Sequence, residues 1–332
     1  MRKNLLLLLA SVLLCLLAFE GVLRVISPKS PPGTTFGKPV RRNAEGFRDR
    51  DFAVPKPEGT YRILVLGDSF TWGIGLEVEE TLPKQLERLL RRERPDLEVI
   101  NASIPGQNTT HELATLREKG LRYEPDMVVL AYCLNDIEFD PDVTVGAGGA
   151  TPAAPHAGAS PPARALLYDP TKGLRGFVYW FQLRSKLVAF LVPRVGNLLR
   201  RVGLLKSAEF SWVEKTFQGY TEENLGWRES RGALAELAQV CRERRLPLIV
   251  AIYPLLTQLH QYRGRGAHET VRSECERLGI PAVDLLGVFE NRDAWELWVN
   301  FMDGHPNAKA HALATEALLP LVRASMPPGA PQ

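Results

Sequence analysis

The stretch RILVLGDSFTWGIG, Arg62–Gly75, passes directly from a strand pattern into a polar turn. Residues 61–67, YRILVLG, form a short apolar run that ends in glycine, which is typical of a buried strand. Asp68 and Ser69 follow at the exit of that strand. A serine in this position either caps the next helix or serves as a nucleophile that substrate can reach. The choice depends on whether the chain also supplies a base, an acid and oxyanion donors.

The chain continues in alternating strand and helix patterns. The expected strands are residues 61–67, 97–103, 126–136, 246–254 and 280–286. The expected helices are residues 79–95, 110–123, 229–245, 268–279 and 307–324. Repeated strand–helix–strand units predict a parallel sheet with helices on both faces. The turn after the first strand lacks the glycine spacing of a dinucleotide site and the Lys-Ser/Thr of a phosphate loop.

Composition limits the classes of protein that remain. The chain has 332 residues, 45% of them hydrophobic and 24% charged, which allows one large domain or two modest ones with a buried core. A net charge of +3 gives no electrostatic reason to expect nucleic acid as a partner. The four cysteines form no C-x-x-C pair, so neither a zinc site nor a disulfide framework is indicated. A Cys241–Cys275 bridge stays open, although two unrelated buried thiols are the preferred interpretation.

The N-terminus has the pattern of an export segment. Two basic residues precede an apolar run over residues 5–19, which suits the core of a signal peptide. No clear A-x-A cleavage site follows, so we favour an uncleaved membrane anchor over residues 1–26 and keep a removed signal as the alternative. Glu20 and Arg24 are spaced to pair on one helix face. Either interpretation places the rest of the chain outside the cytoplasm, tethered to the membrane or secreted.

Two further segments interrupt or precede the alternating pattern. Residues 27–60 are rich in proline and glycine and are expected to form an extended lead. The main domain is expected over residues 61–326, with an insertion at about 140–215. The insertion begins with Gly/Ala/Pro low complexity and continues with an aromatic, basic stretch over residues 176–205. We favour a helical insertion packed on the domain over a lid or a surface that leans on the membrane.

Polar segments follow three of the expected strands, and a fourth precedes the last helix. They are GDSFTWG at 67–73, IPGQN at 104–108, CLND at 133–136 and MDGHPN at 302–307. The carboxyl ends of parallel strands share one edge of a sheet, where ligands bind at the point at which strand order reverses. The fourth segment can reach the same edge from the loop before the final helix. Each segment alone has an ordinary explanation as a cap or turn, but together they favour a catalytic site.

These four segments, in this order, resemble those of the SGNH (GDSL-like) hydrolase superfamily, in its membrane-anchored bacterial form. The resemblance implies that Ser69 is the nucleophile, that Asp303 and His305 complete a catalytic triad, and that an oxyanion hole is formed by Ser69, Gly106 and Asn135. It also implies a three-layer α/β/α, flavodoxin-like fold whose five parallel strands lie in the order 2-1-3-4-5. Many members space the final pair as D-x-x-H, whereas this chain has D-x-H.

The chemistry of these residue types fits those roles. A serine hydroxyl is a weak nucleophile and needs a base within hydrogen-bond reach, here His305. Residues two apart in an extended segment point to the same side, so Asp303 can orient that imidazole. Loss of one oxyanion donor typically costs roughly 3–4 kcal/mol of barrier lowering. Asp68 is expected to be a structural hydrogen-bonding residue. No histidine pair has the spacing of metal ligands, so neither a metal nor another cofactor is expected.

The sequence therefore predicts a serine esterase that acts through a Ser69 acyl-enzyme. Location and resemblance together suggest O-acetyl groups of a cell-envelope polysaccharide as the acyl-ester substrate, with the membrane as a partner through the N-terminal segment. One alternative is an O-acetyltransferase that passes the acyl group to a sugar. Others are a non-catalytic envelope protein that retains the fold, and a lipase-like enzyme suggested by the aromatic insertion.

Overall fold

The computed structural model describes residues 2–26, 33–138, 185–188, 191, 195, 212–300 and 303–327. The chain divides into two units. One comprises Met1–Pro31 and Pro161–Ser211, and the other comprises Pro32–Ser160 and Trp212–Gln332. Most of the expected insertion, including nearly all of its aromatic stretch, lies outside the described residues.

The first unit contains helix α1 (Arg2–Ile26). The expected pair is confirmed: Arg24 Nε lies 2.7 Å from Glu20 Oε1. The same carboxylate accepts hydrogen bonds from the Ser185 hydroxyl at 2.8 Å and the Leu187 backbone N–H at 2.7 Å. Burial acts to raise the pKa of Glu20, but these hydrogen bonds outweigh it and lower the pKa to about 2. Glu20 therefore binds the start of a second helical segment within this unit.

The membrane anchor expected over residues 1–26 finds no support here. Among the described residues, no helix combines the length and the apolar character needed to cross a bilayer.

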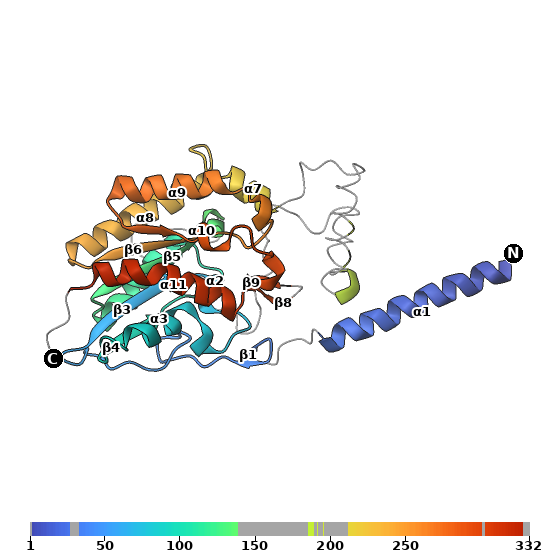
Figure 1. The fold of residues 1–332 in the computed structure, drawn as a ribbon, viewed down its shortest axis with the longest axis horizontal. Coiled ribbons are helices and arrows are strands. Elements are labelled where there is room, and N and C mark those ends of the chain that lie inside the picture. Colours follow the sequence, from blue (N-terminus) through green and yellow to red (C-terminus); the bar gives the residue numbers. More distant parts are fainter. Residues whose placement is uncertain are drawn as a thin grey trace. The chain divides into compact units, whose positions relative to one another are not determined.

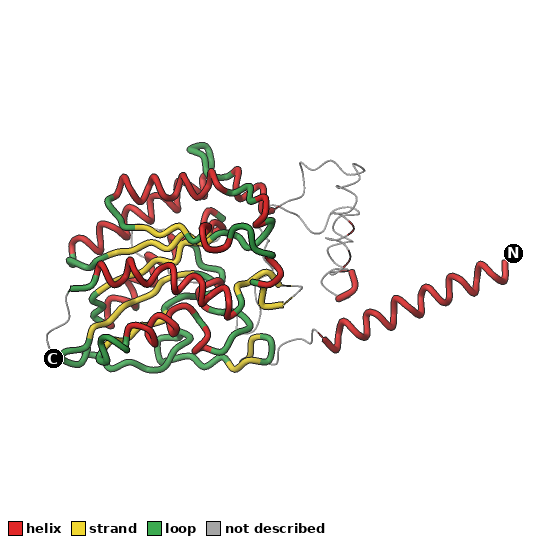
Figure 2. The backbone as a smooth tube through the Cα atoms, viewed as in Figure 1, coloured by secondary structure: helices red, strands yellow, loops and turns green. Residues whose placement is uncertain are grey.

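The second unit contains a five-stranded parallel sheet (Figures 1 and 2). Its strands lie in the order β4-β3-β5-β6-β7, which is the predicted 2-1-3-4-5. Their bounds are β3 (Tyr61–Gly67), β4 (Leu97–Asn101), β5 (Met127–Cys133), β6 (Leu248–Tyr253) and β7 (Ala282–Asp284). Every residue of β3, β5 and β6 is buried, because helices cover both faces of a parallel sheet.

Helices cover the sheet on both faces, so the three-layer α/β/α fold is confirmed. On one face, α3 (Leu82–Leu90) packs against α11 (Ala308–Ser325) (Figure 1). On the other face, α4 (Thr109–Glu118) packs against α8 (Leu225–Glu243), which contacts α9 (Arg265–Leu278). An asparagine side chain accepts a backbone N–H at the start of three of these helices, which are α4, α8 and α11.

Short elements fill the loops of the second unit. They are β1 (Thr34–Thr35), β2 (Lys38–Pro39), α2 (Ser69–Trp72), α7 (Trp212–Gln218), α10 (Leu286–Phe289), β8 (Trp298–Asn300) and β9 (Asp303–Pro306). Short 3-10 turns include η1 (Val78–Glu80), η2 (Gly120–Tyr123), η3 (Leu134–Ile137), η5 (Leu259–Gln261) and η6 (Ala294–Glu296). Strands β8 and β9 form a separate antiparallel pair.

The extended lead expected over residues 27–60 is wrong for much of its length. The second unit begins at Pro32, so most of this segment belongs to it. Phe47, Arg48 and Asp49 are buried, with exposed fractions of 0%, 1% and 7%. The proline- and glycine-rich composition hid a segment whose charged side chains bind the interior of the domain.

Candidate active site

The predicted nucleophile lies at the first residue of a one-turn helix directly after β3. Asp68 caps this helix, α2, by accepting the Phe70 backbone N–H at 2.8 Å. The preceding Gly67 permits the tight turn: a Cβ there would lie 2.7 Å from Thr71 Oγ1 and 3.3 Å from the Ala131 Cβ. The turn therefore presents Ser69 at the carboxyl edge of the sheet. The sequence allowed two roles for Ser69, a helix cap or a nucleophile. In the structure Asp68 is the cap, so capping does not explain the serine.

Ser69, His305 and Asp303 meet in the folded chain, as predicted. His305 Nε2 lies 3.0 Å from Ser69 Oγ, and His305 Nδ1 lies 2.5 Å from Asp303 Oδ1. The same carboxylate oxygen accepts the His305 backbone N–H at 3.0 Å. The D-x-H spacing is sufficient because β9 is extended, so both side chains point to one side of the strand. This geometry is that of a nucleophile, a base and an orienting acid.

The surroundings favour an ionised Asp303. Burial acts to raise its pKa, but the hydrogen bonds and charge of His305 outweigh burial and hold the pKa of Asp303 below its usual range. The Phe70 ring packs on the imidazole with ring centroids 5.6 Å apart. The side chains of His305 and Asp303 remain 27% and 24% exposed, so substrate can reach them from solvent.

The catalytic hairpin, β8–β9, is anchored on both sides. Trp298 Nε1 donates to the Leu256 carbonyl at 2.6 Å. The Asn307 side chain donates to the carbonyls of Glu296 and Trp298 at 2.8 and 3.1 Å, and it also caps α11 by accepting the Ala310 N–H. One asparagine thus joins the hairpin to the last helix. These bonds hold His305 in place while its side chain stays accessible.

The three expected oxyanion donors come from three neighbouring loops. They are the backbone N–H groups of Ser69 and Gly106 and the side-chain amide of Asn135. In the described part of the chain, no acceptor is bonded to either backbone N–H. Gly106 has φ of 81°, a conformation that favours glycine, and it is exposed. Asn135 Nδ2 donates to Asp68 Oδ2 at 3.2 Å, which orients the amide and leaves its second N–H for substrate.

Behind these donors lies a group of buried carboxyls that sequence reasoning did not identify. Asp68, Glu112 and Asp136 have exposed fractions of 1%, 0% and 2%. Burial, together with their mutual repulsion, raises the pKa of Glu112 and of Asp136 well above the usual range. Thr109 donates to Asp136 at 3.1 Å, whereas both Glu112 oxygens lack a hydrogen-bond partner among the described residues. Nothing local in the helix pattern of α4 distinguishes Glu112 from an exposed glutamate.

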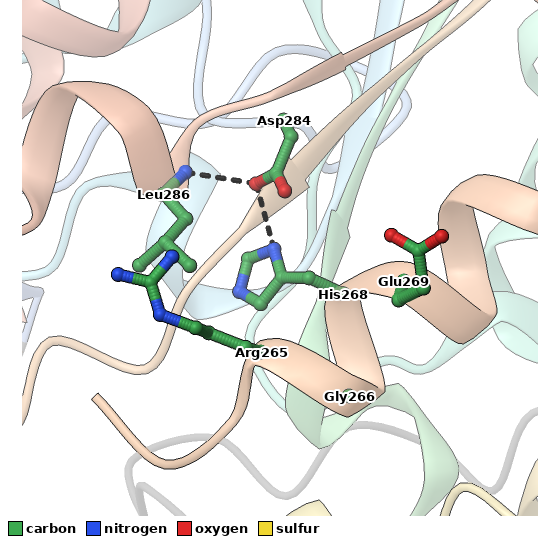
Figure 3. Close-up of a pocket in the computed structure, with 6 residues that line it drawn as sticks. All are labelled: Arg265, Gly266, His268, Glu269, Asp284 and Leu286. Carbon is green, nitrogen blue, oxygen red and sulfur yellow. Dashed lines mark hydrogen bonds and ion pairs between the residues drawn. The ribbon is translucent and has the colours of Figure 1, made fainter.

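A second histidine–aspartate pair lines a pocket of about 380 Å³ at the start of α9 (Figure 3). His268 Nδ1 lies 2.7 Å from Asp284 Oδ1, which also accepts the Leu286 N–H at 2.9 Å. The other ring nitrogen of His268 lies 3.4 Å from the Tyr262 hydroxyl rather than from a serine. These polar groups bond to one another and join α9 to the end of β7. Among the described residues that line this pocket there is no serine or cysteine.

The second unit is a three-layer α/β/α domain in which a serine, a histidine and an aspartate converge in the arrangement typical of serine hydrolases. A family model described as the GDSL-like lipase/acylhydrolase family matches residues 65–313, which is most of the chain. The chain belongs to this family of ester-bond hydrolases. The matched range includes all five residues predicted for the triad and the oxyanion hole.

Individual relatives are more distant. An arylesterase from Vibrio mimicus is 34% identical over 79 residues, so the match spans 24% of this chain and only 40% of that relative. The lipase/acylhydrolase from Enterococcus faecalis has 15% identity and a TM-score of 0.46, with 82% of this chain and 100% of that chain covered. An acetylxylan esterase from Geobacillus stearothermophilus has 14% identity and a TM-score of 0.44, with 79% and 94% covered. The activities in these names are those of the relatives themselves.

Proposed function

We propose that this chain is a serine esterase that hydrolyses acyl esters through a Ser69 acyl-enzyme. The observation that carries the proposal is the continuous hydrogen-bonded set of Ser69, His305 and Asp303, with distances of 3.0 and 2.5 Å. The second requirement is a set of donors for a developing oxyanion. The backbone N–H groups of Ser69 and Gly106 and the side-chain amide of Asn135 can supply them.

The proposed mechanism follows from those positions. Ser69 Oγ attacks the acyl carbon and transfers its proton to His305 Nε2, while Asp303 stabilises the resulting imidazolium. The N–H groups of Ser69, Gly106 and Asn135 bind the oxyanion of the tetrahedral intermediate. His305 then protonates the leaving alcohol, which leaves an acyl-serine. A water molecule, deprotonated by the same imidazole, hydrolyses that acyl-serine and restores the free hydroxyl.

A fluorophosphonate probe tests the proposal directly, because it reacts with an activated serine. We expect the wild-type protein to be labelled once and Ser69→Ala not to be labelled. A wild type that resists the probe, or equal labelling of Ser69→Ala, would contradict the esterase proposal. Circular dichroism of both proteins provides the folding control.

We further propose that the natural substrate is an O-acetylated glycan of the cell envelope, met outside the cytoplasm. The basic residues and apolar run at the N-terminus support export. Trp295, which is 65% exposed on the turn η6 beside the catalytic hairpin, supports a sugar substrate. The electron-rich face of an indole suits the C–H groups of a sugar ring, and that turn is held by the bonds from Asn307 and Lys309 to Glu296.

Trp295→Ala separates a glycan substrate from a small ester. We expect the KM for an acetylated polysaccharide to rise and the KM for an aryl acetate to stay unchanged, because only the polymer reaches the indole. Val54→Ala, which removes another exposed apolar side chain, is the control. Unchanged kinetics of Trp295→Ala on every acetylated polysaccharide tried would refute the stacking role. Cell fractionation tests the location.

A further inference from the structure

A buried arginine contacts the turn that carries the nucleophile. Arg48 is 1% exposed and lies in the segment RNAEGFRDRDF, residues 42–52. Its Nη1 donates to the Trp72 carbonyl at 3.1 Å and to the Gly73 carbonyl, and its Nη2 donates to the Leu76 carbonyl. We propose that Arg48 is a positioning residue, which holds the turn after Ser69 so that the serine and its N–H keep their catalytic geometry.

The helix α2 needs such a partner because it is a single turn. The carbonyls of its last residues accept no hydrogen bond from N–H groups of the helix itself. A cation near a helix C-terminus is also favoured by the helix dipole. Gly73, which ends the helix, has φ of 84°. A Cβ at Gly73 would lie 2.5 Å from Thr81 Cγ2 and 3.5 Å from the Arg48 guanidinium. The loop is therefore packed closely between α3 and the arginine, with little room to shift.

The hydrogen bonds of Arg48 all go to loop carbonyls, while the charges of Glu77 and Glu80 favour its protonated form without a direct ion pair among the described residues. Among the described residues, Arg48 forms no ion pair; its guanidinium lies 4.6 Å from the centroid of the Trp72 ring. Burial lowers its pKa to about 10, so the group still carries its charge at neutral pH. Burying a charge without hydrogen-bond partners costs free energy. The buried guanidinium therefore favours the loop position in which these carbonyls accept its hydrogen bonds. Movement of the turn would remove its hydrogen bonds.

The next residue, Asp49, binds the end of β4, which leads into the loop that carries Gly106. Asp49 Oδ2 accepts the Asn101 backbone N–H at 2.9 Å. Asn101 Oδ1 in turn accepts the Ser103 N–H at 3.3 Å, at the start of the loop that leads to Gly106. The buried ammonium of Lys84, 2.8 Å from Asp49, neutralises this carboxylate. Consecutive residues thus contact the turn after Ser69 and the end of β4, from which the loop that carries Gly106 leaves.

The consequence for catalysis concerns the transition state. The N–H groups of Ser69 and Gly106 both act on the oxyanion, so their relative position affects kcat more than ground-state binding. A misplacement of about 1 Å can reduce the rate by roughly 100-fold. Arg48 touches neither substrate nor reacting atoms, and its effect is transmitted through the 72–76 loop.

The test compares two arginines of the same segment. Arg50 is 44% exposed and pairs with Glu87 at 2.7 Å, away from the 72–76 loop. With an aryl acetate we expect Arg48→Ala to lower kcat by roughly 10²-fold with KM changed less than about threefold. Arg48→Lys should recover part of kcat, because it keeps the charge but not the forked donors. Arg50→Ala should lower the melting temperature and leave kcat near the wild-type value.

Chemical rescue provides a readout that lost stability alone would not produce. Guanidinium ion at a non-denaturing concentration should raise kcat of Arg48→Ala, whereas equal sodium chloride should not. Wild-type kcat in Arg48→Ala, or an equal loss of kcat in Arg50→Ala, would overturn the proposal. If Arg48→Ala fails to fold, Arg48→Lys decides: wild-type kcat in that variant overturns it, and a reduced kcat with unchanged KM supports it.

The inference rests on the proposed function, and the fluorophosphonate probe distinguishes the two failures. A wild type that is not labelled refutes the esterase. A labelled wild type, with Arg48→Ala labelled at the same rate, refutes only the positioning role.

Discussion

One oxygen of Asp303 binds two donors of the same neighbouring residue. It accepts both the backbone N–H of His305 at 3.0 Å and the ring Nδ1 at 2.5 Å. This closed arrangement fixes the imidazole relative to its own backbone, so the ring can rotate little. The acid therefore acts mainly by orienting the base and stabilising its protonated form.

At the residue scale, Asp303→Asn should lower kcat by roughly 10²–10⁴-fold, because an amide favours the wrong orientation and tautomer of the imidazole. The free energy of unfolding should change little, since an amide of the same size fills the site. Steady-state kinetics and urea denaturation on the same preparation check both parts. Retention of wild-type kcat would remove Asp303 from the mechanism.

A second residue-scale prediction concerns Gly67. Gly67→Ala places a Cβ 2.7 Å from Thr71 Oγ1 in the helix that carries Ser69, so we expect destabilisation of about 1–3 kcal/mol and a lower kcat. Gly232→Ala is the matched control, because nothing lies within 4 Å of its Cβ position in α8. The free energy of unfolding of Gly232→Ala should instead rise by roughly 0.5–1 kcal/mol. Melting temperatures that shift equally in both variants would contradict the steric argument.

At the element scale, the catalytic hairpin depends on the helix that follows it. Asn307 caps α11 and also holds the carbonyls of Glu296 and Trp298. His305 therefore takes its position from a short antiparallel pair fastened to the helix start, rather than from the main sheet.

Asn307→Ala should lower both the free energy of unfolding and kcat. We expect a loss of about 1 kcal/mol from the cap, together with a reduced kcat because the hairpin loses two anchors. Asn224→Ala removes the corresponding cap of α8, whose Trp227 N–H lies 3.1 Å from the asparagine oxygen. The control should lose similar stability without a comparable change in kcat. Equal kcat values in the two variants would show that the hairpin does not need this anchor.

At the scale of the whole molecule, the buried carboxyls make stability depend on pH. Glu112 is 0% exposed, and burial together with the charge of Asp68 raises its pKa well above the unfolded value. The unfolded chain therefore releases this proton at a lower pH than the folded chain. The contribution of Glu112 to the free energy of unfolding is fully present below the unfolded pKa of about 4.3 and is lost as the pH rises toward the folded pKa.

Glu112→Gln should remove that part of the pH dependence. We expect the free energy of unfolding of the variant to fall less than that of the wild type between pH 5 and pH 8, with the variant the more stable protein at pH 8. Glu118→Gln, at an exposed position of the same helix, is the control. Urea denaturation at several pH values measures the difference, and parallel curves for Glu112→Gln and the wild type would contradict the assignment.

Much of the architecture was predictable from local sequence patterns. Tyr61–Gly67 is an expected strand with its observed bounds. The order of the five strands, which the family resemblance implied, is the observed one. Apolar runs and the glycines and prolines that bound them act within a few residues, so they can be interpreted without knowledge of the fold. The five candidate site residues were named through the family resemblance, and the shared edge of a parallel sheet gives a physical reason for polar segments at strand ends to lie close together.

Other features were decided only by the tertiary structure. Arg48 and Glu112 are charged residues in polar surroundings of the sequence, where exposure is the ordinary expectation. Arg48 is buried because carbonyls of residues 72–76 converge on it, and Glu112 because α4 packs against both β3 and α8. Such burial depends on partners far along the chain. The sequence by itself determined the five strands of the main sheet and its covering helices and pointed to the candidate triad, because these signals are local, whereas long-range packing decided which charges lie inside the domain.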